Sequence, residues 1–170
     1  MPSPEAAALE RKYRTLVAWR DAHAHDGAVA ARGELQRLAV EFPGCLRELD
    51  TLPREELERR ADVLARGDDE PWVLPLARYH ALMRTVLAVR RSGGDADRIA
   101  ALADALAAET GIALDAADVD AIARPPQGRL VVYVFERLGA LFGVEPDALR
   151  DQLFPEPATA RRRRAAQNAP

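Results

Sequence analysis

The chain has 170 residues, of which 48% are apolar and 30% are charged, and its formal net charge is −3. This length fits one domain, or one domain with tails, and is long enough to bury a substantial core. No apolar run approaches the roughly 20 residues that a membrane-spanning helix needs, which excludes a transmembrane protein.

The cysteine content and the first residues both bear on the compartment. The single cysteine, Cys45, excludes an internal disulfide framework. The first residues lack the basic start and apolar stretch that a signal peptide needs. Both features predict a cytoplasmic protein. Between "FPG" and "LREL", Cys45 is predicted to be a small buried residue rather than a catalytic thiol.

The acidic charge lies in the first 160 residues, where 20 basic residues face 27 acidic ones and leave −7. The last ten residues hold four arginines, Arg161–Arg164, and no acid. An acidic folded part does not suit a general polyanion binder. Since 23 of the 24 basic residues are arginine and 34 residues are alanine, the arginine content indicates a composition bias rather than nucleic-acid recognition.

Helical periodicity begins near the start of the chain. A first helix is predicted over residues 5–25, with Leu9, Leu16 and Trp19 on one face and Tyr13 beside them. A second helix is predicted over residues 35–42. Pro43 and Gly44 end it, because proline disfavours helix at the residue before it and glycine tolerates a reversed turn.

The next segment is predicted to be a short turn followed by a charged helix. "CLRELD", residues 45–50, is interpreted as one turn. Asp50 and Thr51 are candidate caps for a helix over residues 53–66, in which proline is allowed in the first turn. "GDDE", residues 67–70, is predicted to be a solvated turn.

The most apolar long segment, Trp72–Arg91, is predicted to be a central helix. Asp95 is expected to cap the helix after it, and Gly111 to close that helix. Asp115 is expected to cap a short helix that carries Val119 and Ile122.

"RPPQG" breaks the chain, and Leu130–Phe142 is predicted to be a second central, buried helix rather than a strand. The sequence therefore predicts an all-α, single-domain irregular bundle of six to eight helices over residues 1–155. Residues 156–170 have no periodicity and are predicted to be a disordered basic tail.

Three histidines are the first candidates for chemistry. Residues two apart on a helix point roughly 200° apart, so His23 and His25 are not expected to chelate one metal. His80 sits at the border of an apolar face. None of the three has a His or Glu partner three or four residues away, as paired helical ligands need. No metal and no cofactor are therefore predicted.

Other catalytic patterns are weak. Asp115, Asp118 and Asp120 lack the glycine and the spacing of a calcium loop. "RRSGGDAD" lacks the lysine and the preceding strand of a phosphate-binding loop. The only serines, Ser3 and Ser92, lie in predicted turns or termini and do not suit a catalytic triad. An enzyme is disfavoured on these grounds.

"LGALFGVEPDALRDQLF", Leu138–Phe154, has the outline of a helix-turn-helix. Gly139 is small where two helices would approach, and Gly143 would form the turn. A recognition helix needs outward donors for phosphates and base edges. This one offers three carboxylates against Arg150 and Gln152, which favours a packed helix corner over a DNA reader.

Three hypotheses for function remain. The favoured one is a non-enzymatic protein that acts through protein–protein interaction or regulation. The alternative is a DNA-binding regulator that uses residues 130–154 and the arginine tail, and the third is a small helical enzyme or metal protein. Binding of nucleic acid or an acidic partner would use Arg150, Gln152, Arg161, Arg162, Arg163 and Arg164. The oligomeric state is left open.

Overall fold

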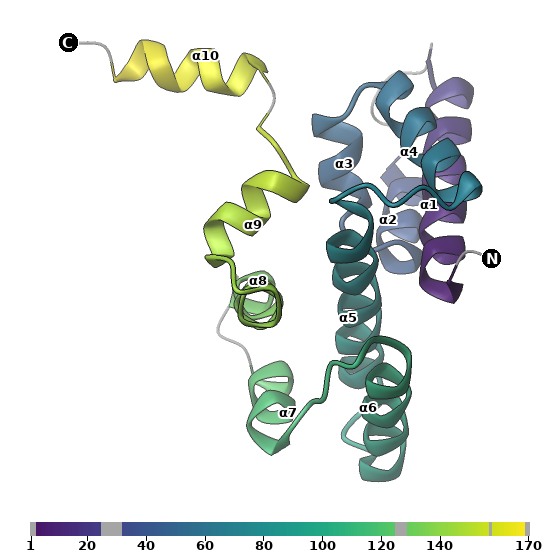
Figure 1. The fold of residues 1–170 in the computed structure, drawn as a ribbon, viewed down its shortest axis with the longest axis vertical. Coiled ribbons are helices and arrows are strands. Elements are labelled where there is room, and N and C mark those ends of the chain that lie inside the picture. The colour runs from purple at the N-terminus through teal and green to yellow at the C-terminus, as the bar shows by residue number, and fades with distance from the viewer. Residues whose placement is uncertain (1–2, 25–31, 125–128, 157, 169–170) are drawn as a thin grey trace. The chain divides into compact units, whose positions relative to one another are not determined.

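The computed structural model describes residues 3–24, 32–124, 129–156 and 158–168, and Figure 1 shows its ribbon. Every regular element in these ranges is a helix, which confirms the predicted all-α class. The helices are α1 Pro4–Ala22, α2 Arg32–Glu41, α3 Cys45–Thr51, α4 Arg54–Arg66, α5 Val73–Arg91, α6 Ala96–Thr110, α7 Ala116–Ala123, α8 Arg129–Phe142, α9 Pro146–Leu153 and α10 Ala158–Gln167. None of these described helices combines the length and apolar composition that crossing a bilayer requires.

The chain forms two compact units, where the sequence predicted one domain. Unit 1 comprises Met1–Glu70 and Arg150–Pro170, and unit 2 comprises Pro71–Leu149. The first boundary falls at the end of the predicted solvated turn, residues 67–70. Each unit has its own set of packed helices. The apolar pattern of the sequence marks each helix but not which helices pack together, so it did not reveal the boundary between the units.

In unit 1, α1 packs along α4, and α3 packs against both α1 and α2. The apolar positions of α1 and α4 recur at helical spacing and are buried: Leu9, Tyr13, Leu16, Leu57, Ala61 and Leu64. Each fully buried leucine contributes roughly 1.5–3 kcal/mol relative to an exposed one. These contacts hold the helices that present the charged groups described below.

In unit 2, α5 packs against α6, α7 and α8, and α7 also packs against α8. Tyr79 of α5 stacks on Phe135 of α8, with ring centroids 5.3 Å apart. Both predicted central helices are therefore present within a residue of their expected bounds. The expected caps are confirmed as well, since the side chains of Asp95 and Asp115 accept hydrogen bonds from backbone amides, and Gly111 has a left-handed φ of 74°.

The predicted turn at residues 45–50 is wrong, because it is helix α3. Gly44, with φ 81°, reverses the chain before it, and the amide of Leu52 donates to the carbonyl of Glu48 at its end. Asp50 and Thr51 therefore lie inside a helix and do not cap the next one. Helix α4 starts after Pro53, which provides no side-chain cap.

The disordered tail is not confirmed, because α10 spans most of it. Its sequence, "ATARRRRAAQ", consists mainly of alanine and arginine, which are strong helix formers. It has no apolar stripe, and periodicity therefore did not reveal it. Together with α3, this helix raises the number among the described residues to ten, above the predicted six to eight.

Candidate functional site

An arginine-lined cleft in unit 1 is the strongest candidate site. Its volume is about 600 Å³, and its lining consists of Arg47, Arg150, Asp151, Pro155, Glu156 and Arg164. Helix α3 provides the first arginine, α9 the second and α10 the third. Three basic and two acidic side chains give the lining a net charge of +1, whereas the whole chain carries −3.

The three guanidinium groups of the cleft differ in their partners. Arg164 forms an ion pair with Glu156. The Nε atom of Arg150 lies 3.4 Å from Oδ1 of its neighbour Asp151, which is a loose contact. No ion pair or hydrogen bond among the described residues engages the guanidinium of Arg47, which is exposed. Through Arg47, the cleft therefore presents donors that an anionic group can reach.

The structure brings two of the six predicted binding residues together, Arg150 and Arg164. Gln152, Arg162 and Arg163 are exposed but do not line the cleft. Arg161 lies in α10, and its side chain is outside the described part of the chain.

Four lining residues of the cleft were not predicted as binding residues: Arg47, Asp151, Pro155 and Glu156. Arg47 lies within the segment interpreted as a turn, more than a hundred positions before Arg150. No local sequence signal connects the two arginines.

The corner between α8 and α9 has the close approach that the sequence predicted. A Cβ atom on Gly139 would lie 2.5 Å from the carbonyl oxygen of Val144, and real Cβ atoms essentially never come that close. The amide of Val144 donates to the carbonyl of Gly139 at 2.9 Å, and Gly143 has a φ of 65°. This is a glycine-terminated helix end, followed by a short helix.

The surface of α9 does not match a DNA reader. Leu149 and Leu153 are buried, and the exposed positions of the helix are Asp147, Ala148, Asp151 and Gln152. Two carboxylates on this face would repel phosphates, and of its four exposed positions only Gln152 offers a side-chain donor. The corner between α8 and α9 is therefore better explained by helix packing than by recognition of a DNA groove.

Unit 1 also contains a buried polar cluster made of Lys12, Tyr13, Glu48 and Arg60. Lys12 and Glu48 form an ion pair in which both side chains are fully buried. Lys12 also donates to the carbonyl of Pro43 at 3.1 Å. The Tyr13 hydroxyl donates to Glu48 at 2.5 Å and accepts from Arg60 at 3.1 Å. The cluster connects α1, α3 and α4.

The electrostatics of this cluster favour a structural role. Burial, with the Glu48 carboxylate second, holds the pKa of Tyr13 well above its ordinary value, so the phenol stays neutral. Burial raises the pKa of the neighbouring Cys45 thiol to about 11, which keeps it protonated and unreactive. Cys45 is fully buried, as the sequence predicted. Neither group is prepared to act as a nucleophile or a base.

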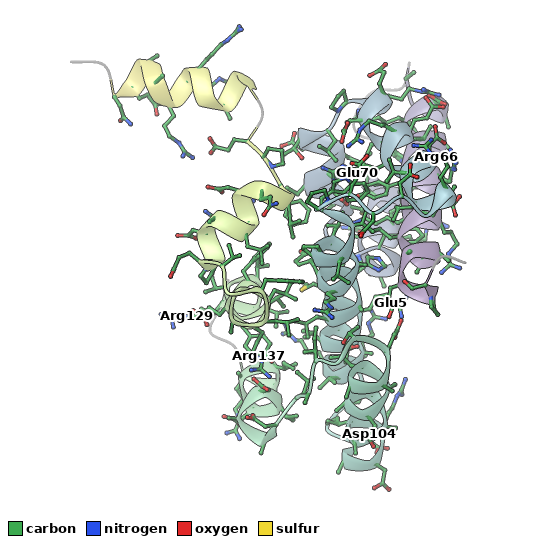
Figure 2. All side chains as sticks on the ribbon, viewed as in Figure 1. Glu5, Arg66, Glu70, Asp104, Arg129 and Arg137 are labelled. Carbon is green, nitrogen blue, oxygen red and sulfur yellow. The ribbon has the colours of Figure 1, made fainter. Side chains whose placement is uncertain are left out.

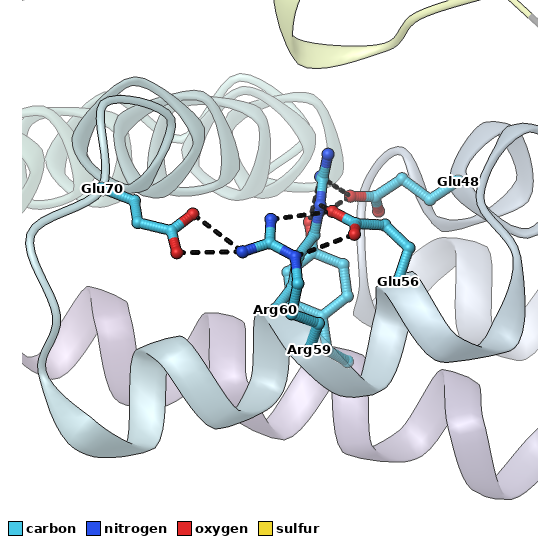
Figure 3. Close-up of polar contacts among 6 residues, drawn as sticks. Glu48, Glu56, Arg59, Arg60 and Glu70 are labelled. Atoms are coloured by element: carbon cyan, nitrogen blue, oxygen red, sulfur yellow. Dashed lines mark hydrogen bonds and ion pairs between the residues drawn. The ribbon is translucent and has the colours of Figure 1, made fainter.

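A second set of charges lies on the surface of the same unit. Figure 3 shows Arg59 between two carboxylates, with Nε 2.9 Å from Glu56 and Nη1 2.9 Å from Glu70. Arg60 shares Glu56 through its own Nε at 3.1 Å. The pair with Glu70 ties the end of the first segment of unit 1 to α4. The two ion pairs of Arg59 are exposed or half-buried, so each contributes modestly to stability.

In unit 2, Arg137 of α8 is paired with Asp118 of α7 at 2.8 Å. Its guanidinium also donates to the carbonyl of Ala113 at 2.7 Å. Figure 2 labels the Arg137 side chain, which lies between α8 and α7. Asp118 completes the capping box of α7 with Asp115. A small hollow of about 320 Å³ beside Arg137 is otherwise apolar.

The histidines do not form a metal site among the described residues. His23 stacks on Trp19 with ring centroids 4.6 Å apart, and its Nε2 atom lies 3.1 Å from Glu34. His80 is buried in α5 of unit 2. His25 lies outside the described residues. Within the described ranges, no group of three or more histidine, cysteine or acidic residues is placed to hold a metal ion.

Comparison with protein-family models, with curated proteins and with solved structures finds no significant match. The site is therefore interpreted from its own residues. Of the arrangements described, the arginine-lined cleft is the one that presents charged groups to a ligand.

Proposed function

We propose that this chain is a non-enzymatic cytoplasmic interaction protein whose arginine-lined cleft binds an acidic segment of a protein partner. The observation that carries the proposal is the convergence of Arg47, Arg150 and Arg164, from three separate helices, on one cleft. Arginine suits this role, because its planar guanidinium donates two parallel hydrogen bonds to a carboxylate. The cytoplasmic assignment rests on the cysteine content.

The size and charge of the cleft suit a short peptide segment. A volume of about 600 Å³ lies within the ordinary range of ligand sites. Its net positive lining on a negatively charged chain would attract an acidic segment, with an affinity that falls as salt rises. A protein partner therefore fits better than a long polyanion, which the acidic remainder of the chain would repel.

Fluorescence anisotropy with a labelled oligo-glutamate peptide tests the proposal, with oligo-lysine as the negative probe. Arg47→Ala removes the accessible guanidinium and is expected to weaken binding about tenfold, the effect of losing a hydrogen bond to a charged group. The matched control is Arg11→Ala, which removes the same charge from an exposed position of α1 outside the cleft. Equal weakening by both variants would show a general charge effect and contradict the proposal.

Random-sequence duplex DNA is the competing probe for the DNA-binding alternative. We expect no DNA binding at moderate salt, because the exposed face of α9 carries Asp147 and Asp151. If DNA binds more tightly than the peptide, and Arg150→Ala abolishes the binding, the DNA-binding function replaces the one proposed.

A further inference from the structure

We infer that Glu156 is an internal occupant of the arginine-lined cleft, so that an acidic ligand must displace it from Arg164. The inference rests on the proposed function and adds how the same site is regulated. Glu156 and Arg164 both line the cleft and form an ion pair with each other. They are eight residues apart, so the pair ties α10 back to the segment that follows α9.

The two acids of the cleft are placed differently. Glu156 exposes 29% of its side chain, whereas Asp151 exposes 69%. Asp151 contacts the arginine next to it in sequence at 3.4 Å, a distance typical of a weak, solvated pair. Glu156, in contrast, is partly enclosed and reaches an arginine on α10 from the segment that follows α9. It therefore holds the position of a bound carboxylate.

This arrangement indicates which chemical group the cleft takes. Arg164 already binds a side-chain carboxylate from its own chain, so a glutamate or aspartate of a partner would make the same contact. Arg47 has no ion pair among the described residues and would make the first contact. A segment with two nearby acidic residues would then occupy Arg47 and replace Glu156 at Arg164.

The competition between Glu156 and an acidic peptide for Arg164 should change the affinity for the peptide by a measurable amount. Arg164 is 69% exposed, and surface ion pairs contribute at most about a fivefold change in an equilibrium constant. Removing the internal carboxylate is therefore expected to tighten peptide binding by about threefold to fivefold. The effect is small enough that a matched charge control is essential.

Glu156→Gln tests the inference in the whole 170-residue chain, with Asp69→Asn as its control. Both substitutions remove one negative charge from unit 1, but Asp69 is exposed in the turn after α4 and does not line the cleft. We expect Glu156→Gln to bind the labelled oligo-glutamate peptide about threefold to fivefold more tightly, and Asp69→Asn to bind it like the original chain. Circular dichroism and urea unfolding check that both variants fold.

The outcomes separate this inference from the proposed function. If the peptide binds and Arg47→Ala weakens it, but Glu156→Gln is no tighter than Asp69→Asn, internal competition is refuted and the cleft stands. If only Glu156→Gln binds, the inference is supported in its strongest form. If no variant binds, both proposals fail. If tripolyphosphate displaces the peptide more effectively than unlabelled oligo-glutamate, the preference for carboxylates is overturned.

Discussion

Replacing Gly139 with alanine tests the tightest backbone contact in unit 2, where α8 ends and the chain turns into α9. The new Cβ atom would lie 2.5 Å from the carbonyl oxygen of Val144. The obstacle is backbone rather than a flexible side-chain end, so the corner itself must shift. The shift strains the hydrogen bond from Val144 to Gly139, which measures 2.9 Å.

The size of the effect follows from three contributions. Overpacking costs about 1–3 kcal/mol, and a weakened hydrogen bond costs about 1 kcal/mol. Alanine in place of a helical glycine returns about 1 kcal/mol. We therefore expect the free energy of unfolding of unit 2 to fall by about 1–3 kcal/mol, the overpacking cost that remains when the other two contributions cancel.

Urea unfolding followed by tryptophan fluorescence measures this change. Unit 1 contains Trp19 and unit 2 contains Trp72, so a Trp19→Phe background leaves one reporter in unit 2. The control is Gly33→Ala in α2, where an added Cβ meets nothing within 4 Å. In a Trp72→Phe background, this control is expected to stabilise unit 1 by up to about 1 kcal/mol. If Gly139→Ala is as stable as the original chain, the close contact at this corner is refuted.

Three further outcomes are expected in unit 1. Lys12→Met leaves the Glu48 carboxylate buried without its ammonium partner and should cost about 3–5 kcal/mol in urea unfolding, whereas an unchanged midpoint would refute the burial of the pair. The Cys45 thiol, with its pKa raised to about 11, should not react with a thiol-directed disulfide reagent at neutral pH until urea is added; rapid reaction of the folded chain would contradict its burial. Because the pKa of Tyr13 is higher in the folded chain than in the unfolded one, the contribution of Tyr13 to the free energy of unfolding should be constant below about pH 10 and fall above it. Thermal unfolding across that range checks this, and Tyr13→Phe should remove the part of the fall that this phenol causes.

Local features of the fold could be predicted because they depend on neighbouring residues. Asp95 and Asp115 are short acceptors placed just before helices, and both cap them. Gly111 and Gly143 follow helices at positions where a left-handed φ is needed, and both adopt it. The error at α3 is of the same local kind, because seven residues are too few for periodicity to distinguish a helix from a turn.

The candidate site could not be predicted because it depends on tertiary placement. The sequence showed that Lys12 is the only lysine, but not that Glu48 would bury it. It also provided Arg150 and Arg164 as binding candidates, but not the third arginine, which belongs to α3. With 23 arginines in the chain, composition gives no means of choosing which of them meet.

The buried position of Lys12 has a practical consequence for labelling and cross-linking. No other residue of this sequence carries an ε-amino group, and that one is fully enclosed by unit 1. Reagents that acylate lysine therefore have no ε-amine to modify while unit 1 stays folded. Lys12 can be acylated only when α1 opens away from α3 and α4. The rate of its acylation therefore measures how often this part of unit 1 unfolds locally.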